Sequence, residues 1–405
     1  MTHEASSALI KAPGAGLTVA SKLAERTLAA RASRAGIEFA PAEVFVAGGR
    51  TFIVGSRDPG AYPTINAALA VARDGDQILV RPGSYAHGFL LERDVEIRRD
   101  GGGEAIVHVV PDEPIRVTAS RGHVIGLTIH DADWVRVNGL RPGEGSDDPR
   151  PIVIVEAGST TFERVTFETS RSGLMVTGPG TAPQFFGCEH LGFRSPVTVV
   201  CGGATPTFRD CRILMGLEVR DSGTGGHWEG GWIDTVLVSA ALADPSFEDV
   251  DFEGYSGLVT FRDHAEGLLR GCRIRAQYGS PVGAAIVIEG HARPRLVGNE
   301  IALENWRRHS PAIKVQGAST SPLLRANVVE FSPPRPADER SALWVLAGAA
   351  PRLASNRLGG RVIAFGDATL VLDDGDGLGG VEPELRDRAH LVRSHVAFPD
   401  VRQDD

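Results

Sequence analysis

Apolar residues recur along this chain in short segments that can be laid over one another. Nine segments share an apolar residue, two variable residues and then a small, polar or aliphatic residue, and most end on another apolar residue two positions later. They begin at Val124, Phe162, Phe185, Phe208, Phe247, Leu269, Leu296, Leu324 and Leu353. The starts are separated by 38, 23, 23, 39, 22, 27, 28 and 29 residues, a range typical of stacked repeats. The alternation of apolar residues within a segment is the period of a β-strand.

A second apolar run lies between successive segments, as at 152–155, 197–200 and 286–288. Most of these runs end at glycine or a polar turn residue, and six segments have a proline two residues before their start: Pro183, Pro206, Pro245, Pro294, Pro322 and Pro351. Glycine and proline both punctuate turns between short strands. Two or three strands per turn of about 25 residues predict an all-β fold, a single-stranded parallel β-helix of about 9–11 coils.

Equivalent residues of successive coils stack, so the fourth position of the repeat predicts a column inside the solenoid. It contains Leu127, Val165, Cys188, Cys211, Val250, Cys272, Asn299, Asn327 and Asn356. A buried asparagine costs free energy unless its amide is paired, so we expect these amides to hydrogen-bond along the axis or to cap the adjacent turn. The cysteines are interpreted as small buried apolar residues, because no Cys-x-x-Cys or Cys/His spacing indicates a metal site.

The ends of a parallel solenoid need covering, because their outer strands expose unpaired edges. Residues 64–72 have helical composition with Thr64 at the capping position, and they predict a helix that caps the first regular coil. Residues 18–32 predict a second short helix, either a docking helix or a loosely attached arm, and 45–54 predict a hairpin around Gly48-Gly49. The predicted organisation is an N-terminal extension over 1–50, the β-helix over 51–375, and a cap or tail over 376–405.

One stretch of the chain resembles a known group. Residues 62–65, 67–69, 75–80 and 82–85 are similar to the opening of pectin-lyase-like right-handed β-helix proteins. The later Pro-x-Leu-x-x-Asn-x-Ile copies resemble repeats of carbohydrate-binding and sugar-hydrolase β-helix domains. This resemblance covers about residues 50–375 and implies right-handed winding. It implies no single function, because the superfamily includes lyases, hydrolases, esterases, tailspikes and non-catalytic interaction domains.

Composition and charge narrow the class of partner. The 405 residues carry a net charge of −9, and the basic residues are dispersed, which argues against nucleic acid or an anionic membrane as partner. Residues 1–50 lack a basic stretch followed by an apolar run, and no apolar run approaches the length of a membrane span. Four cysteines without paired spacing agree with a reducing compartment. The sequence therefore predicts a cytoplasmic protein, and side-by-side association into a homo-oligomer is left open.

The two long gaps in the repeat predict inserted loops, where functional side chains concentrate. The first, 137–150, contains three acidic residues and follows Trp134; the second, 220–234, is rich in glycine. The residues that we expect to bind a ligand are Trp134, His227, Trp228, Glu229 and Trp232. Tryptophan rings stack on sugars, and a histidine and a carboxylate beside them could act as acid or base. The alternative is an irregular turn whose tryptophans cover a coil edge.

The catalytic sets that the resemblance implies are mostly missing. Asp249, Asp251 and Glu253 alternate on one strand and could hold a cation, but alternating acids are also the ordinary solvent face of a strand. Residues 373–380 look like a calcium-binding loop without its final glutamate. We therefore expect no metal and no cofactor, with calcium as the one exception considered.

Two hypotheses of different class follow. The leading one is a non-catalytic binding or scaffold protein that recognises a protein or a glycan along its outer face. The alternative is a polysaccharide lyase or hydrolase in which Glu229 or Asp234 acts as acid or base and His227 is its partner. Loss of activity in Glu229→Gln distinguishes the enzyme from the scaffold.

Overall fold

The computed structural model describes residues 48–55, 59–110, 112–131, 150–170, 172–192, 196–255, 257–277, 283–304, 310–332, 340–373, 378 and 380–394. The chain divides into two compact units, Met1–Val44 and Phe45–Asp405, and the described residues all belong to the second. The helix expected at 18–32 and the first arm of the expected hairpin lie outside the described residues. The second arm, Thr51–Val54, is a strand that pairs in parallel with Gln77–Val80.

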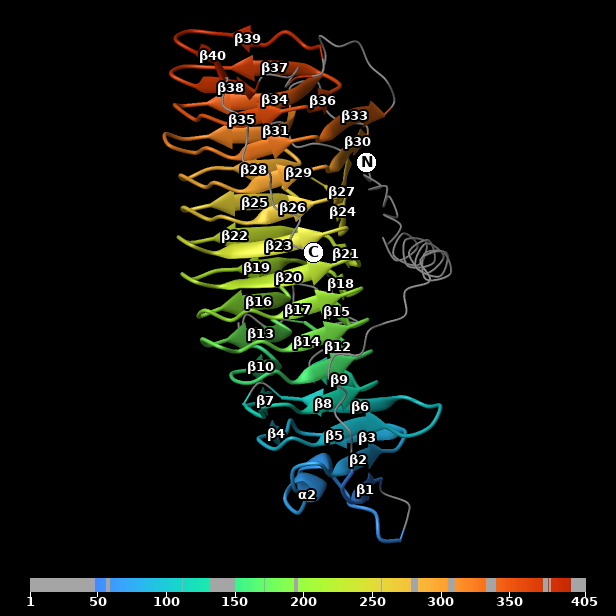
Figure 1. Cartoon of the computed structure of the whole chain (residues 1–405). Coiled ribbons are helices and arrows are strands. Elements are labelled where there is room, and N and C mark those ends of the chain that lie inside the picture. Colours follow the sequence, from blue (N-terminus) through green and yellow to red (C-terminus); the bar gives the residue numbers. More distant parts are fainter. Residues whose placement is uncertain are drawn as a thin grey trace, which may run out of the picture. The chain divides into compact units, whose positions relative to one another are not determined.

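The second unit is a right-handed parallel β-helix of about 13 turns, as the sequence pattern predicts for the fold (Figure 1). Its strands form three sheets of 15, 13 and 12 strands. Sheet A contains β1 (Thr51–Val54), β2 (Gln77–Val80), β5 (Glu96–Arg99), β8 (His123–Ile125), β11 (Thr161–Glu163), β14 (Gln184–Phe186), β17 (Thr207–Arg209), β20 (Gly225–Glu229), β23 (Asp244–Glu248), β26 (Leu268–Arg270), β29 (Arg295–Val297), β32 (Leu323–Arg325), β35 (Arg352–Ala354), β38 (Thr369–Asp373) and β40 (His390–Ser394).

The chain turns from each strand of sheet A into sheet B and from there into sheet C. Sheet B contains β3 (Gly83–Ala86), β6 (Ala105–Val109), β9 (Thr128–Asp131), β12 (Thr166–Thr169), β15 (Glu189–Gly192), β18 (Arg212–Ile213), β21 (Trp232–Ile233), β24 (Asp251–Gly254), β27 (Arg273–Gln277), β30 (Glu300–Glu304), β33 (Val328–Ser332) and β36 (Arg357–Leu358). Sheet C contains β4 (Leu90–Leu91), β7 (Ile115–Val117), β10 (Val153–Val155), β13 (Leu174–Thr177), β16 (Thr198–Cys201), β19 (Leu217–Val219), β22 (Val236–Ser239), β25 (Val259–Arg262), β28 (Ile286–Ile288), β31 (Pro311–Gln316), β34 (Ser341–Leu346), β37 (Arg361–Ala364) and β39 (Glu384–Leu385). The repeat segments thus form the strands of sheets A and B and the corner between them. The second apolar runs form the strands of sheet C.

The two long gaps in the repeat have different causes. The strand at 123–125 pairs directly with the strand at 161–163, so the first gap holds extra residues between β9 and β10, most of them outside the described ranges. The second gap holds a complete coil formed by β19 to β22. Trp228 pairs with Phe208 before it and Phe247 after it. The predicted insertion at 220–234 is therefore wrong, and further coils before Val124 and after Leu353 raise the number above the 9–11 expected.

The coil that the sequence pattern missed fits the repeat if tryptophan is allowed at the first position and glycine at the fourth. Trp228 occupies the first apolar position and Ile233 the last, while Gly231 stands where other coils have leucine, valine, cysteine or asparagine. Gly231 has φ 76°, and a Cβ there would lie 2.2 Å from the carbonyl oxygen of Cys211. Only glycine fits this position, so the coil lacks the residue type that marks its neighbours.

Aromatic side chains form a continuous stack inside sheet A. The ring centroids of Phe162 and Phe185 are 4.9 Å apart, those of Phe185 and Phe208 4.4 Å, those of Phe208 and Trp228 5.2 Å, and those of Trp228 and Phe247 4.9 Å. The interplanar angles lie between 7° and 23°. Parallel strands in register place equivalent residues one rung apart, which is the spacing of stacked rings. Each ring is buried and packs on the coils above and below it.

The predicted column of asparagines is confirmed. The Nδ2 of Asn299 donates to Oδ1 of Asn327 over 2.8 Å, and Nδ2 of Asn327 donates to Oδ1 of Asn356 over 3.0 Å. Each amide also donates to the carbonyl oxygen of the first repeat residue one coil earlier, at Leu269, Leu296 and Leu324. The thiols of Cys188, Cys211 and Cys272 lie 3.3–3.4 Å from the equivalent carbonyl oxygens of Phe162, Phe185 and Phe247. The column therefore supplies a donor to this turn even where cysteine replaces asparagine.

Both ends of the described coils depart from the regular repeat. The helix α2 (Ile65–Leu69) begins where the sequence predicts, with Oγ1 of Thr64 accepting a hydrogen bond from the Ala67 N–H over 3.1 Å. It buries Ile65, Ala68 and Leu69. At the other end, β40 pairs with β38 in parallel, so the coils continue past the boundary expected at 375. No helix within the described ranges has the length and apolar character needed to cross a bilayer.

One histidine lies wholly inside the solenoid. His190 is fully buried, its ring centroid is 4.7 Å from that of Phe167, and its Nδ1 lies 2.9 Å from the hydroxyl of Thr198. Burial lowers the pKa of His190 from 6.5 to about 3, because the interior disfavours the charged ring. The folded protein therefore keeps this ring neutral at a pH where the unfolded chain protonates it.

We expect the wild-type protein to lose stability to acid faster than His190→Phe. Because the folded pKa is depressed, the contribution of His190 is intact above pH 6.5 and falls by about 1.4 kcal/mol per pH unit as the pH drops from 6.5 toward 3. Urea unfolding at pH 7 and pH 5 measures the difference, about 2 kcal/mol between the two proteins. Equal pH dependence in both would contradict a neutral buried ring.

Candidate functional site

A row of charged and polar side chains lies on the outer surface of sheet A, on β17, β20, β23 and β26. Strand alternation puts Trp228 inside, so its neighbours His227 and Glu229 face outward, with 35% and 51% of their side chains exposed. The adjacent strands add four outward residues in the same two columns: Arg209, Ser246, Glu248 and Arg270. We call these six residues the His227 face.

Four groups of the His227 face form a connected chain. The Nδ1 of His227 lies 2.8 Å from the hydroxyl of Ser246, which is its direct register partner on β23. The Nε2 on the other side of the ring lies 3.9 Å from Oε2 of Glu229. The same carboxylate oxygen lies 2.9 Å from Nε of Arg209. Glu229 is therefore placed between a guanidinium and an imidazole.

The two sides of the His227 ring have different surroundings, and this selects a tautomer. A carboxylate beside Nε2 favours a proton on that nitrogen, which leaves the lone pair of Nδ1 to accept the Ser246 O–H. A second ion pair, with Nη1 of Arg270 3.7 Å from Oε1 of Glu248, extends the row by one coil. Half-exposed pairs of this kind contribute little to stability, so their main effect is to orient side chains on the surface.

The structure separates the residues that the sequence grouped together. Trp228 is 2% exposed and lies between Phe208 and Phe247, so the expectation that it contacts a ligand is wrong. Trp232 starts β21 on the outer side of sheet B, and the guanidinium of Arg212 lies 5.4 Å above its ring. Trp134 lies outside the described residues.

Asp234 is half-buried in the turn after β21, away from sheet A. Its Oδ2 accepts the Met215 N–H over 2.7 Å, and its Oδ1 accepts the Thr235 hydroxyl over 3.3 Å. Burial raises its pKa, and the hydrogen bonds oppose that rise. By accepting these two hydrogen bonds, the Asp234 carboxylate joins its own turn to the turn of Met215 in the preceding coil.

Sequence reasoning missed Ser246 and Arg209, although a signal for both was present. His227 and Ser246 are 19 residues apart, which is one coil. Had Trp228 been recognised as a repeat position, the register would have placed Ser246 beside His227 and Arg209 beside Glu229.

A second group of ionisable side chains lies on the outer side of sheet B. The rings of His108 and His130 are 5.4 Å apart between centroids, and Nε2 of His130 lies 3.4 Å from Oε2 of Glu168. Burial lowers the pKa of His130, with His108 adding to the effect, while burial and nearby Glu104 and Glu189 raise the pKa of Glu168. No group of three His, Cys, Asp or Glu among the residues of the described ranges is arranged to hold a metal ion.

Of the other acidic candidates, Asp251 is engaged by an arginine. Both carboxylate oxygens of Asp251 accept hydrogen bonds from Arg273, over 2.6 and 2.9 Å. Most of the loop at 373–380 lies outside the described residues. Calcium binding therefore stays a prediction without support from contacts.

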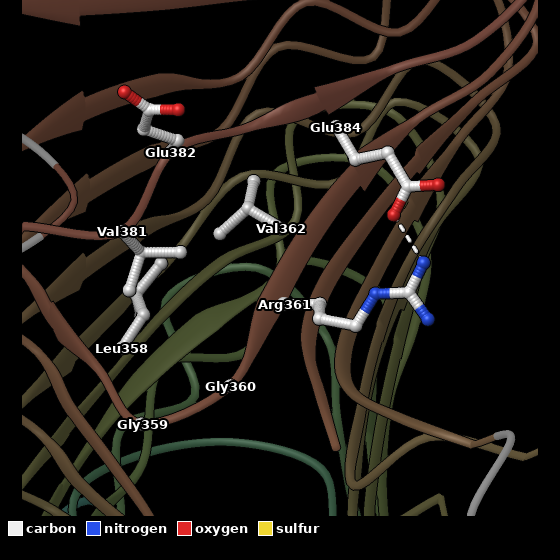
Figure 2. A pocket seen from close by; sticks show the side chains of 8 residues that line it. All are labelled: Leu358, Gly359, Gly360, Arg361, Val362, Val381, Glu382 and Glu384. Atoms are coloured by element: carbon white, nitrogen blue, oxygen red, sulfur yellow. Dashed lines mark hydrogen bonds and ion pairs between the residues drawn. The ribbon is translucent and has the colours of Figure 1, made fainter. Parts of the chain in front are cut away.

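An open hollow near the end of the coils is shown in Figure 2. It is lined by Leu358, Gly359, Gly360, Arg361, Val362, Val381, Glu382 and Glu384. Arg361 is ion-paired with Glu384, and the hydrogen bonds from Arg361 and then Arg386 lower the pKa of this carboxyl.

Comparison with known proteins adds likeness in fold alone. No model of a protein family matches the sequence, and no curated protein does. A crystal structure of a pectin methylesterase variant in complex with a hexasaccharide has 13% identity, over 72% of this chain and 92% of its own, with a TM-score of 0.34. Tailspike protein 3 of bacteriophage CBA120 has 13% identity, over 86% of this chain and 62% of its own, with a TM-score of 0.39. The pectin methylesterase from Aspergillus niger has 14% identity, over 85% of each chain, with a TM-score of 0.24.

Sequence identities and TM-scores this low say nothing about activity. The fold is therefore assigned from the strand pairing. Successive coils contribute strands to three sheets, and every pair among the described strands is parallel. Hydrogen-bonded asparagines of successive coils lie along the corner between sheets A and B. By these features the chain is a right-handed parallel β-helix.

Proposed function

We propose that the protein is a glycan-binding β-helix that holds a polyhydroxylated chain against the His227 face. The observation that carries the proposal is the row itself, in which Arg209, His227, Glu229 and Ser246 lie outward in adjacent register positions. An open strand face suits an extended ligand that runs along the solenoid axis.

The chemistry of the row suits hydroxyl groups. Guanidinium groups only donate hydrogen bonds, carboxylates only accept them, and the Ser246 hydroxyl does both. A sugar hydroxyl also does both, so it can bridge an Arg and a Glu that already lie side by side. Each Arg–Glu pair on this face therefore offers one donor and one acceptor to a sugar hydroxyl. Binding of the sugar over such a pair buries no uncompensated charge.

The geometry does not favour the enzyme with paired carboxylates. Glu229 lies on sheet A, whereas Asp234 follows β21 of sheet B and its carboxylate is held by the Met215 N–H. A pair that acts as acid and base must flank one bond of the substrate. A protein ligand, association between copies and a cytoplasmic location stay predictions from the sequence.

We expect Arg209→Ala to weaken glycan binding at least 10-fold. The probe is an array of neutral and uronic-acid oligosaccharides, followed by calorimetry with the strongest binder. Arg357→Ala is the matched control, because Arg357 is also an exposed arginine, 2.8 Å from Oε1 of Glu330, but on sheet B. If no oligosaccharide binds, or if both variants bind equally well, the His227 face is not the glycan site.

A further inference from the structure

We propose that Ser246 is a nucleophile for acyl transfer, that His227 is its general base, and that Glu229 positions the base. The substrates are carboxylic esters that reach an open surface, either small esters or ester substituents on an extended polyhydroxylated chain. This activity goes beyond binding, and it does not require that the face bind a glycan.

The first step of the argument is the contact between nucleophile and base. The 2.8 Å from Ser246 Oγ to His227 Nδ1 is within the range that a general base needs to remove a hydroxyl proton. Both residues lie on paired strands of a rigid sheet, with register fixed by the buried Trp228 and Phe247 beside them. The pair is therefore held in place without help from a loop.

The second step is the orientation of the imidazole. Glu229 lies 3.9 Å from Nε2, on the side of the ring opposite Ser246. This is longer than a hydrogen bond but close enough for its charge to favour the Nε2–H tautomer and to stabilise the imidazolium that forms during reaction. The Nε of Arg209 lies 2.9 Å from the same carboxylate oxygen and adds a positive charge beside it.

The third step is access. His227 is 35% exposed, and Ser246 is half-buried rather than covered. No other hydroxyl of this column is bonded to a histidine in the same way: Thr161 pairs in register with His123, but among the hydrogen bonds of the described residues none joins the two. Among the described residues of sheet A, Thr207 and Thr369 also lie in register beside a histidine, His227 and His390, and no hydrogen bond joins either pair. The histidine-bonded hydroxyl is thus particular to Ser246 within the described part of this sheet.

The reaction needs only Ser246, His227, the ester and water. Ser246 Oγ bonds to the acyl carbon while its proton passes to Nδ1 of His227. The bond from the acyl carbon to the leaving oxygen then breaks, and His227 returns the proton to that oxygen, which releases an alcohol. Water, deprotonated by His227, attacks the acyl-serine and releases the carboxylic acid, and Ser246 regains its proton.

The test uses the full chain and two probes, a fluorophosphonate and p-nitrophenyl acetate. We expect the fluorophosphonate to modify Ser246, as located by peptide mass spectrometry, and Ser246→Ala to abolish that modification. His227→Ala should slow both the labelling and the ester hydrolysis about 10²–10⁴-fold, with partial rescue by added imidazole. Glu229→Gln should lower kcat more than KM, with partial recovery in Glu229→Asp, because a positioning residue acts through the histidine.

Thr161→Ala is the matched control, and we expect it to change neither rate. Circular dichroism confirms that each variant is folded. The proposal is overturned if the folded wild-type protein is not labelled at Ser246, or if His227→Ala is labelled as fast as wild type. Both readouts are independent of the oligosaccharide array, so failure of glycan binding and failure of acyl transfer are distinguishable.

Discussion

Replacing Asn327 by leucine is expected to destabilise the protein by about 4 kcal/mol, because it breaks the polar column at its middle member. The Oδ1 of Asn327 accepts both the backbone N–H and the Nδ2 of Asn299, and its Nδ2 donates to Leu296 O and Asn356 Oδ1. Leucine removes all four contacts and leaves buried polar groups on two neighbouring coils without this partner. Urea unfolding followed by circular dichroism measures the loss.

The matched variant for this ladder is Cys272→Asn. Cys272 occupies the same column, its thiol lies 3.3 Å from Phe247 O, and its backbone N–H already donates to Oδ1 of Asn299. An asparagine there extends the ladder by one coil, so we expect stability within about 1 kcal/mol of wild type. A loss below 1 kcal/mol in Asn327→Leu would show that the ladder does not stabilise the coils.

Trp228→Ala is the second large effect, with an expected loss of about 4 kcal/mol in unfolding free energy. The side chain is 2% exposed and stacks on Phe208 at 5.2 Å and on Phe247 at 4.9 Å, so alanine leaves a cavity between two aromatic rings. Coils on both sides lose their contact with the ring. Thermal and urea unfolding of the purified variant measure this loss.

Two variants separate burial from surface effects. Trp228→Phe keeps the stack and removes an indole N–H that has no hydrogen-bond partner among the described residues, so it should cost less than about 1 kcal/mol. Trp232→Ala removes a half-buried ring on the outer side of sheet B and should cost far less than Trp228→Ala. If Trp228→Ala instead leaves stability unchanged and weakens ligand binding, the inward placement of this ring is incorrect.

The corner between sheets A and B was predictable because its chemistry repeats. An asparagine at the same place in three successive coils can be satisfied by its equivalents above and below, which makes the interior column readable from spacing alone. Thr64 is predictable for a different reason, because a helix N-cap is a local interaction between residues three apart. The first gap in the repeat is also correctly interpreted, since β8 and β11 are neighbours across it.

The candidate site was only half predictable. His227 and Glu229 stood out as polar residues beside tryptophans, yet the reason given for them, an inserted loop, is wrong. Trp228 looked like a sugar platform because nothing in its own neighbourhood says whether it faces in or out. The direction is decided by Phe208 and Phe247, which lie one coil away on either side.

The winding of the chain follows from the sequence pattern alone: a strand period of two inside a repeat of one coil forces equivalent apolar and amide side chains into inward columns. Which residues of different coils touch on the outer surface depends on how the coils stack in three dimensions. Ser246 meets His227 because the intervening coil takes 19 residues and no more. This contact depends on the register between the two strands, and that register is settled only when the coils are stacked.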